Sequence, residues 1–292
     1  MVMNLCNINL FVNQQTADKS MTNQINQNKT VMSIHIAEPK QRFLIQTDKE
    51  ISSVERAAFY LLDFPCVRST LQDLLLGVPK APDKTLCPVG SVEFFRAWLY
   101  HLELHEPEPI DYPQELEQFL GRDINQFNDV KSIPPSMFPV FVKPVATKAW
   151  TGFVANKPED IAQLRGSVWT SSVVEFREEF RAYVQGKRML FVSRYDDLED
   201  GCETPSSQVM AFISDMIDAL SAPSSETRLD AYALDVGVCA DGEIRLIELT
   251  DAWACGLYRP DTPKYQGYRM DYFKWLYARW GQIAELGLDQ IP

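Results

Sequence analysis

One stretch decides the fold: residues 229–258 read LDAYALDVGVCADGEIRLIELTDAWACGLY. Tyr232–Cys239 and Glu243–Leu249 each alternate apolar residues with small or polar ones, which is the period-2 pattern of a half-buried strand. Asp241-Gly242 between them is a two-residue sequence that favours a tight hairpin turn. The stretch therefore predicts a β-hairpin.

This hairpin sets two carboxylates face to face. With Asp241-Gly242 at the centre of the turn, Asp235 lies opposite Glu248 on one face. The other face is apolar and holds two pairs, Val236 with Ile247 and Leu234 with Leu249. Like charges directly opposite one another are destabilising, and a divalent cation with oxygen ligands would remove the repulsion. We therefore expect a metal site, with Asp251 as a further acid; the alternative is a solvated face that tolerates both charges.

Length and composition bound the class of protein. A chain of 292 residues with 46% hydrophobic and 23% charged residues is typical of a soluble globular protein with two or three lobes. The formal net charge of −12 argues against nonspecific nucleic-acid binding, because it leaves no basic surplus to neutralise phosphates. It does not exclude a local basic pocket for a nucleotide.

The cysteines and the apolar runs indicate the compartment. No two cysteines form a CxxC pair, and scattered cysteines among apolar neighbours are typical of free thiols in a reducing compartment. No apolar run approaches the length of a membrane span, and no basic region precedes the short apolar patch near the N-terminus. We expect a cytoplasmic protein that does not bind membranes.

Composition divides the chain into three parts. Residues 1–33 are rich in Asn and Gln, cannot bury enough apolar surface to order themselves, and are expected to form a disordered leader. Residues 41–133 alternate strands with helices, including a strand at Phe43–Gln46 and a helix at Val54–Leu62, and predict a small N-terminal α/β domain. A run of prolines marks the boundary with a second domain at residues 134–292.

Lys143 and the loop after it predict contacts with phosphate groups. Lys143 lies on the predicted strand 140–143, whose two valines point the other way, so its side chain faces a cleft. Lysine on a concave face is a natural partner of phosphate. Lys148, Thr151 and Gly152 follow in a loop whose small residues let backbone amides approach phosphates. The alternative for Lys143 alone is a surface lysine at a strand end.

Arg181 lies on another predicted strand, in the run Glu178-Glu179-Phe180-Arg181. The planar guanidinium suits recognition of a carboxylate or a phosphate. The alternative is a local salt bridge to Glu178 or Glu179. Several other chemistries find no support, because the sequence has no P-loop, no HExxH zinc motif and no GxSxG nucleophile motif.

Five short sequence segments, taken in the order in which they occur, resemble one protein family. They are PVGSVEFF, PVFVKP, EEFRAYV, LDVGV and LIELTDAWACGLY, and the resemblance that they carry extends over most of residues 41–260. The chain resembles the ATP-grasp superfamily of carboxylate–amine ligases, and within it a peptide-ligase-like clade. The resemblance implies an α+β fold in which two lobes, about 134–175 and 176–292, clamp a nucleotide. A small α/β domain, residues 41–133, would precede them.

The resemblance also implies how the nucleotide is held. Lys143 and Lys148 would contact the phosphates of ATP, beside Thr151 and Gly152 in their loop. The extended segment Val173–Phe176 would hold adenine by its backbone, and an acid near its end would reach the ribose. The residues expected there are Val174, Glu175, Phe176 and Glu178. Arg181, together with Lys148, would act in catalysis by steadying the transferred phosphate.

The resemblance assigns the facing acids to Mg²⁺. Asp235 and Glu248 would bind the metal, with Glu248 bridging two ions. Many family members have Asn two residues after this Glu, whereas this chain has Thr250. A hydroxyl is a weaker Mg²⁺ ligand than an amide carbonyl, so Asp251 either compensates or one ion is lost. Gly90, in the N-terminal domain, would border the acceptor cleft together with its neighbour Ser91.

The implied activity is ATP-dependent ligation of a carboxylate to an amine through an acyl-phosphate, with ATP and Mg²⁺ as cofactors. The carboxylate substrate would be a small molecule or a peptide, and the acceptor an amine. Two alternatives stay open. Loss of a metal ligand at Thr250 would leave a protein that binds nucleotide for regulation. An acidic face could instead make the chain a non-catalytic protein that docks a basic partner.

Overall fold

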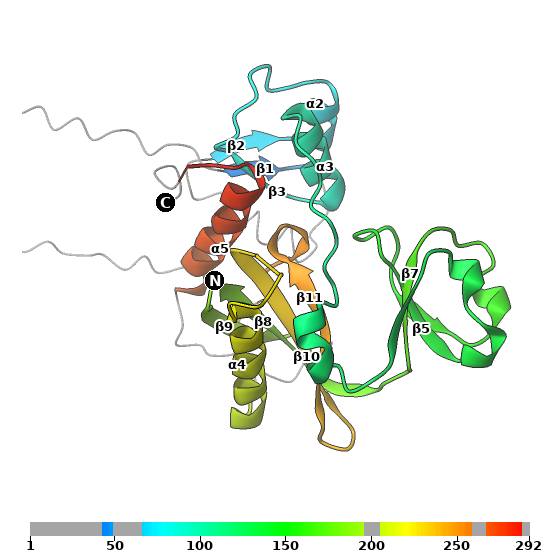
Figure 1. Cartoon of the computed structure of the whole chain (residues 1–292). Helices are drawn as coiled ribbons and strands as arrows, with labels where there is room; N and C mark the ends of the chain where they lie inside the picture. The colour runs from blue at the N-terminus through cyan, green and yellow to red at the C-terminus, as the bar shows by residue number, and fades with distance from the viewer. Residues whose placement is uncertain (1–42, 49–65, 196–204, 259–266, 288–292) are drawn as a thin grey trace, which may run out of the picture. The chain divides into compact units, whose positions relative to one another are not determined.

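The computed structural model describes residues 43–48, 66–195, 205–258 and 267–287. Within these ranges the strands form three separate sheets, one of three strands and two of four (Figure 1). The expected leader at residues 1–33 and the predicted helix Val54–Leu62 lie outside the described residues. None of the helices within the four ranges combines the length and the apolar character needed to cross a membrane.

The first sheet is parallel throughout. It contains β1 (Phe43–Gln46), β2 (Cys66–Ser69) and β3 (Cys87–Val89) in the order β2-β1-β3. The helices α2 (Leu71–Leu75) and α3 (Val92–His101) follow β2 and β3. The strand predicted at Phe43–Gln46 is confirmed. The Ser91 hydroxyl caps α3 by accepting a hydrogen bond from the Phe94 N–H at 3.2 Å.

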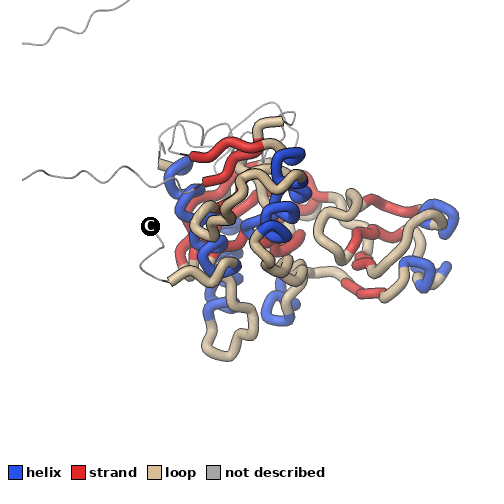
Figure 2. Tube along the Cα trace, turned by 90° about the horizontal axis from the view of Figure 1, so that it is seen from above, coloured by secondary structure: helices blue, strands red, loops and turns tan. Residues whose placement is uncertain are grey.

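The second sheet presents Lys143 on the face opposite its own core. It contains β4 (Ile124–Phe127), β5 (Val140–Pro144), β6 (Phe153–Ala155) and β7 (Val168–Ser171), in the antiparallel order β4-β7-β5-β6. The short turns of 3-10 helix η2 (Val130–Ser132), η3 (Pro135–Met137) and η4 (Pro158–Ile161) accompany it (Figure 2). Val140 and Val142 are buried in its core, which leaves Lys143 and Phe141 on the other face, as the alternation of β5 requires.

This sheet begins before the domain boundary predicted at residue 134. β4 pairs with β7 from Ile124↔Ser171 to Phe127↔Val168, so the sheet begins before the prolines. The preceding turn η1 (Gln114–Phe119) buries Leu116 in the core of the third sheet. The prolines lie in a loop that connects two strands of this one sheet.

The third sheet carries the predicted hairpin. It contains β8 (Phe176–Gln185), β9 (Arg188–Arg194), β10 (Ala231–Cys239) and β11 (Ile244–Asp251), in the antiparallel order β11-β10-β8-β9. Helix α4 (Ser207–Ser221) packs on one face of this sheet through an apolar stripe (Figure 1). The stripe consists of Val209, Ile213, Met216, Ile217 and Leu220. The short turn η5 (Ala252–Ala254) follows β11.

Helix α5 (Tyr268–Ile283) joins the first sheet to the third. Its aromatic residues are buried in the core. The Trp275 indole N–H donates to the Val184 carbonyl at 2.9 Å and to the Tyr232 carbonyl at 3.1 Å. The Trp280 indole N–H donates to the Lys84 carbonyl at 2.7 Å, just before β3. One core therefore includes residues from β1, β3, β8 and α5.

The register of the hairpin is confirmed at the acids and wrong beyond them. Asp235 faces Glu248 and Leu234 faces Leu249, but Val236 faces Leu246 instead of Ile247. The turn is wider than expected: the Cys239 N–H donates to the Glu243 carbonyl at 2.8 Å, and Gly242 takes a φ of +87°. A β-bulge at Ile247 then restores the register, so the two shifts cancel at Asp235.

Candidate active site

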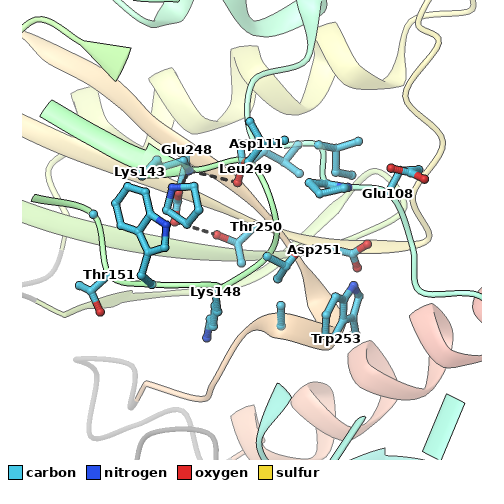
Figure 3. A pocket seen from close by; sticks show the side chains of 18 residues that line it. Glu108, Asp111, Lys143, Lys148, Thr151, Glu248, Leu249, Thr250, Asp251 and Trp253 are labelled. Carbon is cyan, nitrogen blue, oxygen red and sulfur yellow. Dashed lines mark hydrogen bonds and ion pairs between the residues drawn. The ribbon is translucent and has the colours of Figure 1, made fainter. Parts of the chain in front are cut away.

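Three oxygen-bearing side chains converge on one face of the β10–β11 hairpin. The Thr250 hydroxyl lies 3.4 Å from Glu248 Oε1 (Figure 3) and 3.5 Å from Asp235 Oδ2. Glu248 and Thr250 share a face because they are two residues apart on β11. Carboxylates with a hydroxyl between them form an all-oxygen set of the kind that Mg²⁺ prefers. These residues therefore fit a hard divalent cation.

Basic side chains from two other strands balance the acids. Arg181 on β8 donates to both carboxylate oxygens of Asp235, at 2.7 and 2.6 Å. Lys143 on β5 contacts Glu248 and also lies 3.1 Å from Asp111 Oδ1. Arg181 is thus paired across the sheet with Asp235, which lies directly opposite it, and not with Glu178 or Glu179 along its own strand.

These pairs shift the pKa values of their members. Burial disfavours the charge on Lys143, but the carboxylates of Glu248 and Asp111 outweigh it and raise the pKa of Lys143 above its ordinary value. Burial also disfavours the charge on Glu248, and Lys143 overcomes this and lowers the pKa of Glu248. Both groups are therefore charged at neutral pH.

Two cavities meet at this cluster. The first has a volume of about 460 Å³ and includes Lys148, Thr151 and Thr250 in its lining (Figure 3). The second has a volume of about 370 Å³ and is more apolar, with Phe141, Val154, Val173, Val174, Phe176 and Ile247 in its lining. Lys143, Gly152 and Glu248 line both. The predicted residues of the phosphate loop and of the segment 173–176 therefore reach adjoining spaces that share one lysine and one carboxylate.

Two glycines permit the close approaches around these cavities. A Cβ atom on Gly152 would lie 2.6 Å from the Phe141 ring and 3.0 Å from Lys143 Cβ, so only glycine fits beside β5. A Cβ atom on Gly237 would lie 2.1 Å from the Phe176 ring. The glycine of LDVGV therefore makes room for the aromatic ring that lines the second cavity.

Lys148 takes a backbone conformation that is uncommon for lysine. Its φ is +51°, in the left-handed region, which costs free energy unless the surroundings hold it. The preceding carbonyl, of Thr147, accepts a hydrogen bond at 2.9 Å from Arg96 on α3. Arg96 is itself fixed by two bonds of 2.7 Å to Glu106. The first sheet's helix thus holds the loop that carries Lys148.

Asp251 is not brought together with the two facing acids. Its carboxylate accepts two hydrogen bonds from Arg279 on α5, at 2.7 and 2.6 Å, because successive residues of a strand point to opposite faces. The structure therefore places the Asp251 carboxylate against Arg279, and its part in the metal site stays a prediction. Within the part of the chain that the structure describes, no group of three or more His, Cys, Asp or Glu side chains could hold a metal.

Several residues predicted for the ribose and for the acceptor cleft lie outside the two cavities. Glu175 and Glu178 line neither cavity, whereas Glu179 lines the second one, because it shares with Arg181 the face of β8 that points there. Gly90 and Ser91 line neither of the two cavities. The Ser91 N–H instead donates to the Gln46 side-chain oxygen at 2.7 Å, which fixes the turn before α3.

Sequence reasoning missed several residues of the site. Asp111 reaches Lys143 from the proline-rich connector, and Trp253 lines the first cavity while stacking on Phe95 at 4.6 Å between ring centroids. Arg122 lines the second cavity. An acid between prolines was a usable signal for Asp111, since prolines fix the connector's path. The other two depend on contacts between residues far apart in sequence.

Comparison with known proteins places the fold. A family model of the ATP-grasp domain, which describes family 3 of one ATP-grasp clade, matches residues 27–280. No curated protein sequence matches the chain. D-alanine–D-alanine ligase from Bacillus anthracis has a similar structure, with a TM-score of 0.51, 13% identity, and coverage of 84% of this chain and 98% of that chain.

Two structures of the ATP-grasp ligase PsnB are also similar. The complex with a phosphomimetic variant of a minimal precursor, Mg and ADP gives a TM-score of 0.46, 12% identity, and coverage of 83% of this chain and 99% of that chain. The complex with minimal precursor gives a TM-score of 0.35 and 14% identity, and the match spans 52% of this chain and only 54% of that one. ATP-grasp proteins use ATP and Mg²⁺. The match over most of the chain, together with the α+β architecture, means that this protein belongs to the ATP-grasp family.

Proposed function

We propose that this protein is an ATP-dependent ligase that joins a carboxylate to an amine through an acyl-phosphate, with Mg²⁺. One observation carries the proposal: Glu248, which faces Asp235 across the hairpin, lines both cavities together with Lys143 and Gly152. A nucleotide needs an apolar space for its base beside a polar space for its phosphates. The two adjoining cavities supply this pair of spaces.

In this proposal the base of ATP occupies the second cavity. Val173, Val174 and Phe176 border it, and Glu179, an acid in the same lining, would contact the ribose. The phosphates extend past Gly152 into the first cavity. Lys143 and Lys148 neutralise their charge there.

Asp235, Glu248 and Thr250 would hold Mg²⁺. The metal, when bound, neutralises phosphate charge and orients the groups that react. Arg181 fixes the carboxylate of Asp235 through two hydrogen bonds, so that its oxygens are presented in a defined orientation. Lys143 contacts Glu248 and Asp111. We infer that it can exchange one of these contacts for a phosphate oxygen.

The chemistry balances in two steps. A carboxylate oxygen of the first substrate attacks the γ-phosphorus of ATP in line, the bond to the bridging oxygen breaks, and ADP leaves. The amine then attacks the acyl carbon, phosphate leaves, and one proton is released as the amide forms. The protein contributes positioning and charge neutralisation. The substrates are a carboxylate, either a small molecule or a peptide, and an amine.

The test is a screen for phosphate release with Mg-ATP and pooled amino acids and peptides, followed by mass spectrometry of the amide product. We expect Asp235→Asn and Glu248→Gln to lower turnover at least about 100-fold, since each removes a charged metal ligand. Asp218→Asn changes an exposed carboxylate on α4 and serves as the matched control. Full turnover in both site variants would refute the assignment.

A second function is favoured by one specific pair of observations. This chain has Thr250 where the resemblance leads us to expect Asn, and the carboxylate of Asp251 is held by Arg279. A chain with a weakened metal site could bind nucleotide for regulation. Calorimetry that finds tight Mg-ATP binding with no turnover on any amino acid or peptide would select this function. The absence of any ATP-induced thermal shift would instead favour a non-catalytic interaction protein.

We also propose that the protein is cytoplasmic. In the described part of the chain Cys66, Cys87, Cys239 and Cys255 are free thiols, which are typical of a reducing compartment. Fractionation of cells with an antibody to the protein tests this.

A further inference from the structure

Strand β11 carries Glu248 at the edge of its sheet. An edge strand leaves one row of backbone groups without a partner strand. Here the connector that precedes β4 supplies partners for part of that row. The Leu249 N–H donates to the Asp111 carbonyl at 2.9 Å, and Arg122 donates to the carbonyls of Leu246 and Ile247, the latter at 2.8 Å.

The bulge at Ile247 decides which way Glu248 points. The turn of the hairpin sets Val236 opposite Leu246. If the ladder continued from there without a bulge, Asp235 would face Ile247, and Glu248 would turn to the other face of the sheet, where the core of α4 lies. A shift of one residue inverts every side chain of a strand. The extra residue therefore returns Glu248 to the face of Asp235.

Arg122 is bonded at the bulge itself. Its two terminal nitrogens donate to the successive carbonyls of Leu246 and Ile247, and one of them also donates to the Leu120 carbonyl at 3.1 Å. A rigid planar fork can satisfy two neighbouring carbonyls at once, which a single ammonium group does less well. The adjacent Gly121 has a φ of +58°, and a Cβ atom there would lie 3.0 Å from the Arg245 side chain, so the corner is tightly fitted.

We propose that Arg122 is a positioning residue for the metal site: it holds the bulge of β11 and thereby keeps Glu248 opposite Asp235. The role rests on the proposed function, because it concerns the binding of Mg²⁺ with ATP. Arg122 acts through the backbone of Leu246 and Ile247, and its effect on the metal passes through Glu248. Residues that hold metal ligands in place typically change metal affinity about 10–100-fold when they are replaced.

The test measures how much Mg²⁺ tightens the binding of a non-hydrolysable ATP analogue. Calorimetry gives the dissociation constant of the analogue with Mg²⁺ and with a chelator, for wild type, Arg122→Gln and Arg122→Lys. We expect Arg122→Gln to reduce the enhancement by Mg²⁺ at least about tenfold, beyond any loss of affinity that it causes in chelator, because Arg122 also lines the second cavity. Arg122→Lys keeps the charge, and its enhancement by Mg²⁺ should lie between those of wild type and Arg122→Gln.

Arg165→Gln is the matched control, because Arg165 also donates to two backbone carbonyls, those of Ala162 and Leu164, at 3.0 and 2.6 Å. It should leave the enhancement unchanged. Hydrogen exchange of residues 244–251 should rise in Arg122→Gln and not in the control. The positioning role would be overturned if Arg122→Gln and Arg122→Lys both left the enhancement by Mg²⁺ unchanged, whether or not hydrogen exchange of residues 244–251 had risen. An equal loss of affinity with and without Mg²⁺ would also overturn it.

The wild-type protein separates this proposal from the proposed function. If the analogue binds wild type no more tightly with Mg²⁺ than in chelator, the metal site itself is refuted, and the role of Arg122 with it. If wild type shows the enhancement and the variants keep it, only the role of Arg122 is refuted.

Discussion

Arg279 on α5 and Asp251 at the end of β11 form a buried pair joined by two hydrogen bonds, at 2.7 and 2.6 Å, with each side chain only 9% exposed. Removing one partner of a buried pair leaves an uncompensated charge, which typically costs about 3–5 kcal/mol. We expect Arg279→Met to lower the free energy of unfolding by that amount, as measured by urea denaturation. Arg188→Met, which removes a longer and more exposed ion pair to Asp271, should cost less than about 1 kcal/mol.

The pairing of Asp251 with Arg279 predicts that Asp251 does not bind Mg²⁺. Because Arg279 holds its carboxylate, Asp251→Asn should leave the enhancement of nucleotide binding by Mg²⁺ within about threefold of wild type, while Glu248→Gln should abolish it. Titration of the ATP analogue at increasing Mg²⁺ concentration measures both. A loss in Asp251→Asn as large as that in Glu248→Gln would return Asp251 to the metal site.

Thr250 should limit the strength of the metal site. Its hydroxyl lies between Asp235 and Glu248, where a longer amide side chain would offer a better oxygen ligand. We expect Thr250→Asn to tighten Mg²⁺-dependent nucleotide binding about tenfold, and Thr250→Val, which removes the hydroxyl at equal volume, to weaken it. Calorimetry checks both variants. Equal affinities in the Asn, Thr and Val forms would mean that position 250 does not contact the metal.

Arg96 should set the affinity for ATP through the Lys148 loop. It donates to the Thr147 carbonyl at 2.9 Å, next to the left-handed backbone of Lys148. We expect Arg96→Met to raise the KM for ATP about 3–10-fold, because the loop is no longer held in the conformation that presents its lysine. Arg96 and Glu106 are partly exposed, so the free energy of unfolding should fall by less than about 1 kcal/mol. A fall in kcat with unchanged KM would contradict this role.

Glu115 should make stability depend on pH in the acid range. Burial disfavours its charge, but hydrogen bonds from the Ser225 hydroxyl and from the backbone N–H groups of Glu226 and Thr227 outweigh this and lower the pKa of Glu115 from 4.5 to about 2. A carboxyl group with a lowered folded-state pKa stabilises the protein above about pH 4.5 and loses this contribution as the pH falls toward 2.

We therefore expect Glu115→Gln to lower the free energy of unfolding by roughly 1–2 kcal/mol at pH 7, allowing for solvent screening. The difference from wild type should shrink steadily between about pH 4.5 and 2. Urea denaturation at several pH values measures it. Glu117→Gln, on an exposed position of the same turn, is the matched control. A difference that is constant with pH would mean that the Glu115 contacts do not depend on its charge.

The β10–β11 hairpin shows which features could be predicted from the sequence and which could not. The facing of Asp235 and Glu248 followed from period-2 alternation and an Asp-Gly turn, both of which are local signals. The prediction succeeded although its turn was one residue too short, because the bulge at Ile247 cancels the difference. Bulges depend on what touches the strand from outside, and Arg122 is 125 positions away from Ile247. No local pattern carries that information.

The partners of the charged residues were harder to predict than the residues themselves. Lys143 and Arg181 were found from strand patterns, but their pairing with Glu248 and Asp235 depends on the order of strands in space. Asp251 was assigned to the metal because it is close in sequence to Glu248. Its side chain points to the opposite face, where Arg279 from a later helix receives it.

The shared core of the first sheet and the last helix bears on how the chain folds during synthesis. The Phe43 ring in β1 packs on those of Phe273 and Tyr277 in α5, at 5.6 and 5.9 Å between ring centroids. A chain made from its N-terminus cannot cover β1 until residues near 277 have left the ribosome. Long-range contacts of this kind form late and leave apolar surface open in the meantime. A nascent chain that stops before α5 should therefore depend on chaperones that bind exposed apolar strands.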